Sequence, residues 1–301
     1  MHIQPTHTMH TALQRLTFLL GLVLITGSNL GYGQSIDPID AINAAWDGDS
    51  ETVKAFLDGG GHPNDRAMDG ATMLLRAADG GHPALVQLLL DHDADPDLQD
   101  SEGGSALLYA IDGEHPDVVQ LLLDHDADPN IQGPDSVSAL TLAAGVGIPD
   151  VVKALLDAGA DHTRRDIEGG TALLNSLRGG FMGREDDYRQ IAQLLLDAGA
   201  DPTAQDRMGR TVLMFAAAQG NEAVVRAVLD AGTDVNATEN RGMTALFAAA
   251  STGQLDASRL LLDAGADVNV QDNEGKTALA YAQEGGHDTV VALLKEAGAQ
   301  E

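Results

Sequence analysis

The sequence predicts an all-α solenoid of about eight helix-turn-helix-loop units, because one pattern recurs through most of the chain. Aligned on one leucine, the units follow one another in steps of 33 residues, with one step stretched to 40. A repeat this short cannot bury its own apolar face, so it has to stack on its neighbours and share one continuous core. The leucines of this column are Leu74, Leu107, Leu140, Leu173, Leu213, Leu246 and Leu279.

A single unit shows how the pattern encodes each element. Residues 211–218 are small and apolar, which suits a short helix packed closely against others. From Glu222 a second helical pattern follows, and Gly232 stands where a left-handed residue after a helix is needed. The polar stretch 234–242 ends in glycine, as a projecting turn does. Each unit is therefore predicted to be a helix, a turn, a second helix and a hairpin-like loop.

The repeated residues resemble those of ankyrin repeats. Residues 70–78 read Gly-Ala-Thr-Met-Leu-Leu-Arg-Ala-Ala, residues 242–250 read Gly-Met-Thr-Ala-Leu-Phe-Ala-Ala-Ala, and most units close on Ala-Asp-Pro or Ala-Asp-Val. Seven units carry the pattern, and residues 39–64 read as an eighth, N-terminal half-cap. The proline and histidine of the family's Thr-Pro-Leu-His signature are absent from every unit. The resemblance covers nearly all of the chain after residue 36 and implies the family's fold, without specifying a partner.

The last unit is expected to cap the stack. The column predicted to face the next unit ends in Lys295, and a charged residue marks the place where no neighbour follows. We expect units near residues 34–66, 67–99, 100–132, 133–165, 166–205, 206–238, 239–271 and 272–301. The apolar members of the column are Leu57, Leu90, Leu123, Leu156, Leu196, Leu229 and Leu262.

Residues 1–33 differ from the repeats and are predicted to be a secretory signal peptide. Arg15 precedes a mostly apolar run over residues 16–25, and Gly31 and Gly33 are the small residues expected before a cut at Gln34. The run is shorter than the roughly 20 residues that a membrane span needs, although an uncleaved anchor is the alternative. Translation starts at Met1 or at Met9. We expect export to a bacterial periplasm or outside the cell, with no stable membrane insertion after cleavage.

Composition limits the classes of partner. The chain has no cysteine, so it forms no disulfide and has no thiol nucleophile. Without residues 1–33, 16 basic and 46 acidic residues remain, a formal charge of −30. Such a charge repels nucleic acid and anionic lipid. The same acidity leaves a second interpretation open, an acidic cation-binding or salt-adapted surface protein.

The sequence offers only weak signals for chemistry. Residues 91–95 read Asp-His-Asp-Ala-Asp, but Pro96 stands where a calcium loop needs glycine. This segment and its copy at residues 124–128 are interpreted as ends of repeats, with Asp93 and Asp126 in a column otherwise held by glycine. The histidines of the two copies share a column, yet no third recurring metal ligand accompanies them. We therefore predict no metal site, no cofactor and no catalytic residue.

The resemblance implies a concave face, formed by loop tips and the exposed side of each first helix, that binds a protein partner. Its N-terminal half carries the acidic residues Asp69, Asp79, Glu102, Asp112 and Asp135, and its C-terminal half carries arginine and methionine. Arginine is common at binding hot spots and methionine adapts to varied shapes. Two structural alternatives remain: the only tryptophan covers the end of the stack, and the arginines neutralise nearby acids. The residues predicted to contact the partner are Trp46, Arg178, Phe181, Met182, Arg207, Met208, Arg210, Arg241 and Met243.

The stretched unit carries seven extra residues near Phe181 and Tyr188, which are predicted to form a loop between two helices. Its apolar side chains make this loop a candidate for a second contact or for self-association. The function that follows from the sequence is a monomeric, non-enzymatic, exported scaffold that binds a protein of unknown identity.

Overall fold

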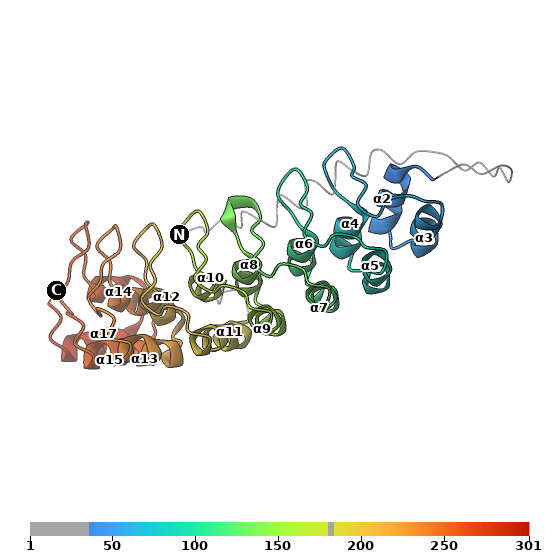
Figure 1. Ribbon diagram of the computed structural model, residues 1–301. Helices are drawn as coiled ribbons and strands as arrows, with labels where there is room; N and C mark the ends of the chain where they lie inside the picture. Colours follow the sequence, from blue (N-terminus) through green and yellow to red (C-terminus); the bar gives the residue numbers. More distant parts are fainter. Residues whose placement is uncertain (1–35, 180–183, 301) are drawn as a thin grey trace. The chain divides into compact units, whose positions relative to one another are not determined.

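The computed structural model describes residues 36–179 and 184–300, in which sixteen α-helices form two parallel rows (Figure 1). The first helix of each unit lies in one row, the second helix lies in the other, and a hairpin loop projects beside each first helix after the initial unit (Figure 1). The first helices are α2 (Pro38–Trp46), α4 (Met73–Asp79), α6 (Ala106–Asp112), α8 (Ala139–Val146), α10 (Ala172–Gly179), α12 (Val212–Gln219), α14 (Ala245–Ser251) and α16 (Ala278–Glu284). The second helices are α3 (Ser50–Asp58), α5 (Pro83–Leu90), α7 (Pro116–Asp124), α9 (Pro149–Asp157), α11 (Glu185–Asp197), α13 (Glu222–Asp230), α15 (Leu255–Asp263) and α17 (Asp288–Glu296).

The predicted all-α solenoid is confirmed, and local sequence explains where its helices begin and end. A serine or threonine precedes most first helices, and its hydroxyl accepts a backbone N–H of the first turn, as Thr72 does from Leu75. After α5 and α7, Asp93 and Asp126 adopt φ values of 62° and 61°, the left-handed conformation that glycine takes in the other units. The interpretation of these aspartates as ends of repeats is thus confirmed.

The core is one continuous apolar layer that runs through the whole stack. Every leucine of the aligned column is at most 2% exposed, from Leu74 to Leu279. The second column, from Leu57 to Leu262, is buried or packs against this core, whereas Lys295 is exposed. No helix among the described residues is both long and apolar enough to span a membrane.

Side chains also connect consecutive units by hydrogen bonds to backbone groups. The ring nitrogens of the turn histidines lie 2.9 to 3.2 Å from carbonyl oxygens of the preceding unit; the pairs are His82 with Trp46, His115 with Asp79, and His287 with Ser251. In the loops, an asparagine or aspartate oxygen accepts the backbone N–H of the residue 31 positions later. We call each such connection between successive loops a rung. The acceptors are Asn64, Asp97, Asn130, Asn236 and Asn269.

The extra residues of the stretched unit do not all form the predicted loop. Residues 185–188 are the first turn of α11, which has 13 residues where most second helices have nine. Tyr188 is 3% exposed, and its hydroxyl donates to the carbonyls of Gly145 and Val146 at 3.0 and 3.3 Å. The expectation that Tyr188 offers a contact surface is therefore wrong, because this ring is buried against the preceding unit. Phe181 and Met182 lie outside the described residues.

Candidate partner-binding surface

Exposed apolar side chains lie on one side of the array. Among the described residues, five large apolar side chains are exposed, and their exposed fractions range from 41% to 104%. Two of them lie on α2 and three at hairpin tips; none lies on a second helix. Single exposed apolar residues are ordinary, but their confinement to hairpin tips and a first helix marks this side as the one available for apolar contact. The five are Ile39, Trp46, Met68, Ile167 and Met208.

Two of the predicted arginines form a cluster around one buried carboxylate. Asp206, whose side chain is 1% exposed, accepts from Arg178 at 2.6 Å and from Arg210 Nε at 2.7 Å through Oδ2. Both guanidinium groups also lie over the ring of Phe215, with Cζ 5.5 and 5.2 Å from its centroid. The side chains of Arg178 and Arg210 are thus engaged within the chain, as the alternative of neutralised acids predicts.

The groups around Asp206 explain why the pKa of its carboxyl is lowered. Burial raises the pKa of the carboxyl, but hydrogen bonds from Arg210 and Arg178 and the charge of Arg210 lower it, and the resulting pKa lies below the ordinary value. Oδ1 accepts two further bonds from the backbone N–H groups of Met208 and Arg210, at 2.8 and 2.9 Å. The carboxylate therefore fixes the hairpin as well as the two arginines.

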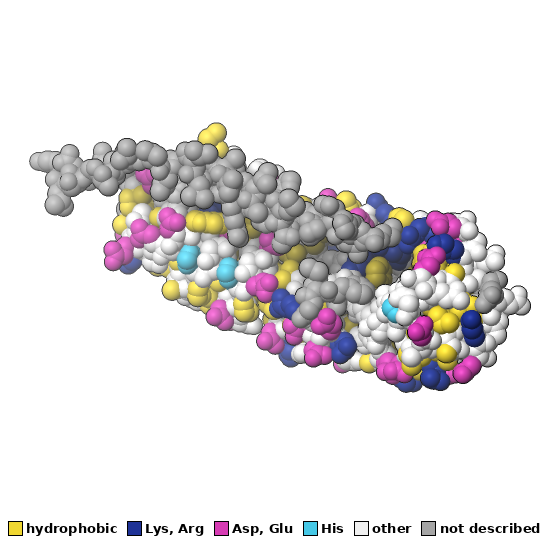
Figure 2. All heavy atoms as spheres, turned by 180° about the vertical axis from the view of Figure 1, so that it is seen from behind, with side chains coloured by type: hydrophobic (Ala, Val, Ile, Leu, Met, Phe, Trp, Pro, Cys, Tyr) yellow, Lys and Arg dark blue, Asp and Glu magenta, His cyan; other side chains and the backbone are white. Residues whose placement is uncertain are grey.

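The remaining predicted residues of the C-terminal half differ in exposure. Arg207 and Met208 are exposed at one hairpin tip, and Arg241 is exposed at the next, 3.5 Å from the buried Glu239. We call Arg207, Met208 and Arg241 the tip patch. Met243 is partly buried against the core, so less of this side chain is available to a partner than the sequence suggested. Figure 2 shows Lys and Arg side chains gathered in the C-terminal half of the face it presents.

The N-terminal half presents one aromatic residue beside acids. The Arg76 guanidinium lies 5.9 Å from the centroid of the Trp46 ring and pairs with Asp69 at 2.5 Å. Trp46 is thus held between the first and second units, and 41% of it stays exposed. Glu102, Asp112 and Asp135 are exposed along the same side of the array.

The histidines of the two acidic segments have a structural role. His92 Nδ1 lies 2.8 Å from the Leu88 carbonyl, and His125 Nδ1 lies 2.9 Å from the Leu121 carbonyl, so each ring closes the end of its own helix. Within the part of the chain that the structure describes, no group of three or more His, Asp or Glu side chains is arranged to hold a metal ion.

Sequence reasoning missed Met68, Ile167 and Phe215. Met68 and Ile167 stand in hairpin-tip columns, as Arg207 does, and a comparison of apolar residues along those columns would have found them. Phe215 reads as an ordinary residue of an apolar helix, and no feature of the sequence shows that two arginines stack on it.

Comparison with known proteins gives matches over most of the array. The family model for ankyrin repeats, described as three copies, matches residues 41–133, 182–272 and 213–301. Among solved structures, the ankyrin repeat domain of Bcl-3, described as a unique member of the IkappaB protein family, is similar with a TM-score of 0.58 and 29% sequence identity. That alignment covers 75% of this chain and 99% of the Bcl-3 chain. No curated protein matches this sequence.

Proposed function

From the premise that this chain belongs to the ankyrin-repeat family, we propose that it is a non-enzymatic scaffold that binds a protein partner through its concave face. Ankyrin repeats in general mediate protein–protein interaction. The face in question consists of the hairpin tips and the exposed side of the first helices.

One observation carries the choice of face: within residues 36–179 and 184–300, the five exposed large apolar side chains lie on hairpins or on α2, and none of them lies on the row of second helices. A protein interface needs desolvated apolar or aromatic anchors near its centre, and in the described part of the chain this side supplies them. Within it, the tip patch combines the exposed Met208 with Arg207 and Arg241. Arg178 and Arg210 support the patch from below by fixing the hairpin through Asp206.

The charges of this chain favour a partner whose surface carries regions of different charge. The whole chain carries a formal charge of −29, which attracts basic proteins from a distance. At contact, the tip patch presents two guanidinium groups, which pair best with carboxylates. A partner with a basic surface and an acidic or apolar contact region fits both properties. The charge of the chain supports the alternative of cation binding, but the described residues contain no group of three or more His, Asp or Glu side chains arranged to hold a cation.

We also propose that the protein is exported, with residues 1–33 removed, to the periplasm or the extracellular medium. The first described helix is capped by Asp37, whose side chain accepts the Ile39 N–H at 2.8 Å. A cut before Gln34 therefore leaves Asp37 and all of the described helices in the mature chain.

The binding face is tested by charge reversal once crosslinking in the native compartment has identified the captured protein. The double variant Arg207→Glu, Met208→Asp is expected to lower the affinity for that protein at least about tenfold, because each substitution removes a contact and adds a repelling charge. Arg259→Glu on α15 is the matched control, since Arg259 is exposed on a second helix and should change the affinity less than about twofold. Equal effects of the two variants, or a larger effect of Arg259→Glu, would place the interface elsewhere.

A further inference from the structure

The rungs that connect successive loops are missing at two positions of the array. In the column that holds asparagine or aspartate in five loops, the other two loops have Thr163 and Thr203. Each threonine hydroxyl turns back and donates to an aspartate of its own loop, Thr163 to Asp161 at 2.6 Å and Thr203 to Asp201 at 2.7 Å. Neither threonine makes the bond to the next unit, so these two rungs are open. The two open rungs are the connections of the stretched unit, residues 166–205, to the unit before it and to the unit after it.

We call the five rungs in which the hydrogen bond is made closed rungs. They show which backbone atoms lack a partner at an open rung. Asn236 accepts the Asp267 N–H at 2.8 Å through Oδ1 and donates from Nδ2 to the Gly265 carbonyl at 3.3 Å. Asn130 makes the same pair of bonds at 2.7 and 3.3 Å, and Asn269 makes them at 2.9 and 3.4 Å. One side-chain carboxamide thus bonds to both a backbone N–H and a backbone carbonyl, which belong to residues two positions apart on the next loop.

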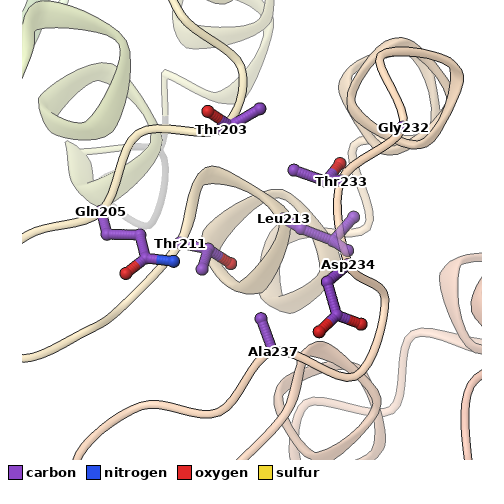
Figure 3. Close-up of a pocket in the computed structure, with 8 residues that line it drawn as sticks. All are labelled: Thr203, Gln205, Thr211, Leu213, Gly232, Thr233, Asp234 and Ala237. Carbon is purple, nitrogen blue, oxygen red and sulfur yellow. The ribbon is translucent and has the colours of Figure 1, made fainter.

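At the Thr203 rung, the corresponding donor and acceptor are the Asp234 N–H and the Gly232 carbonyl. Neither group has a hydrogen-bond partner among the described residues. The residues around them line a partly open pocket of about 280 Å³, shown in Figure 3. Its lining residues are Thr203, Gln205, Thr211, Leu213, Gly232, Thr233, Asp234 and Ala237.

Departures from the repeat pattern create this pocket. Thr203 is shorter than the asparagine of the closed rungs, and Ala237, like Ala204 one unit earlier, stands where Leu98 or Ile131 stands in earlier loops. Thr233 stands where other units have alanine, and its hydroxyl donates to the Val228 carbonyl, which leaves its methyl group for the pocket. Gln205 and Thr211 form the opposite side, where the hairpin bridge between them begins (Figure 3).

The second open rung differs in a neighbouring side chain. His162 stands there in the column that holds proline or valine in the other units, and its Nε2 would lie 3.9 Å from a Cβ placed on Gly199. Around Gly232 no atom lies within 4 Å of such a Cβ. An imidazole thus lies in van der Waals reach of this position at the Thr163 rung, whereas at the Thr203 rung, as at Gly159 and Gly265, no atom lies so close.

We propose that the pocket at the Thr203 rung binds the carboxamide side chain of an asparagine or glutamine from a polypeptide. The carboxamide oxygen accepts the Asp234 N–H and its NH2 group donates to the Gly232 carbonyl, as Asn236 does one unit further on. A carboxylate can only accept and would face both the Gly232 carbonyl and the Asp234 side chain, whereas an ammonium or guanidinium can only donate. This site is separate from the tip patch, and either one stands if the other fails.

The test uses capped amino acids as probes and amide NMR spectra of the whole protein. Acetyl-Asn-methylamide is expected to shift the amide signals of Asp234 and Thr233 saturably, and to bind about tenfold or more tightly than acetyl-Leu-methylamide, since two added hydrogen bonds distinguish them. Acetyl-Asp-methylamide, which has the same shape, should bind as weakly as the leucine probe. Equal binding of the leucine probe would show recognition of backbone amides, and equal binding of the aspartate probe would show no carboxamide recognition; either result overturns the proposal.

A pair of variants separates the pocket from the rest of the array. Thr203→Asn places a carboxamide of the chain itself in the rung, so it should abolish the shifts caused by the asparagine probe. Thr163→Asn makes the same change at the other open rung and should leave probe binding unchanged. Hydrogen exchange gives a second readout, because Thr203→Asn should slow exchange of the Asp234 amide to a rate like that of Asp267. Probe binding that survives Thr203→Asn, or that is lost in Thr163→Asn, contradicts the assignment.

Discussion

Asp206→Asn tests whether the arginine cluster stabilises the C-terminal half of the array. In the parent protein, Oδ1 of Asp206 accepts two backbone N–H groups and Oδ2 accepts Arg178 and Arg210. An asparagine oxygen can keep the two backbone bonds, but its NH2 group then faces two guanidinium donors. The variant therefore loses both charge-assisted bonds and gains an opposed donor.

The magnitude follows from those two bonds. A hydrogen bond to a charged group contributes about 1.5–3 kcal/mol, and the side chains of Arg178 and Arg210 are 21% and 36% exposed, which reduces the contribution of each. We expect Asp206→Asn to lower the free energy of unfolding by about 3 kcal/mol. Asp272 occupies the same column and accepts the same backbone bonds, but its Oδ2 accepts only the Tyr281 hydroxyl at 2.8 Å. Asp272→Asn should therefore cost about 1 kcal/mol.

Urea unfolding followed by far-ultraviolet circular dichroism measures both variants against the parent at constant m value. The pH dependence adds a check. Because the pKa of Asp206 in the folded protein lies below its ordinary value, the carboxylate stabilises the fold fully above about pH 4, and this stabilisation is lost as pH falls through the folded-state pKa. The difference between the parent and Asp206→Asn should then shrink in acid. Equal losses for the Asp206 and Asp272 variants at pH 7, or a difference that does not shrink as the pH falls below about 4, would refute the reasoning.

Three further predictions concern the stack and its export. Asn236→Thr opens a closed rung and should lower the free energy of unfolding by about 1 kcal/mol, measured by the same urea method; an unchanged midpoint would show that rungs do not stabilise the stack. Deletion of residues 272–301 removes α16 and α17 and uncovers the apolar column at Leu262, so the shortened protein should aggregate or unfold less cooperatively in light scattering and thermal scans. Mass spectrometry of the protein from its native host should find a chain that begins at or within a few residues of Gln34, whereas a full-length cytosolic chain would rule out cleavage.

Repetition made most of the fold predictable from the sequence. A residue's role in one unit is repeated 33 positions later, so the pattern at residues 211–218 and Glu222 predicted α12 and α13 to within a residue or two at each end. The same column comparison placed Asp93 and Asp126 in left-handed positions that glycine holds elsewhere. The periodic pattern predicts backbone conformation well because every unit packs against nearly identical neighbours.

The candidate surface was harder to predict because its contacts depart from the repeat. Arg178 bonds to Asp206 in the next unit and stacks on Phe215, yet no other unit has an arginine in the column of Arg178. Tyr188 reads as an exposed loop aromatic until the extra residues are seen to extend α11 by a turn. Thr203 looks like a conservative loop residue, and only the closed rungs show what it lacks. Side chains that break a pattern depend on three-dimensional neighbours, which the pattern does not specify.

The central claim, that the hairpin and first-helix side binds the partner, is tested most directly by site-specific photo-crosslinking in the native host. A photoreactive residue would be placed at the hairpin tips in place of Met68, Ile167 or Met208, and on second helices in place of Ala84, Lys153 or Arg226, all exposed positions. The account predicts that one and the same protein is captured from hairpin-tip positions, with Met208 among them, and from none of the second-helix positions. Capture of that protein from the second helices, with none from the hairpin tips, would contradict it.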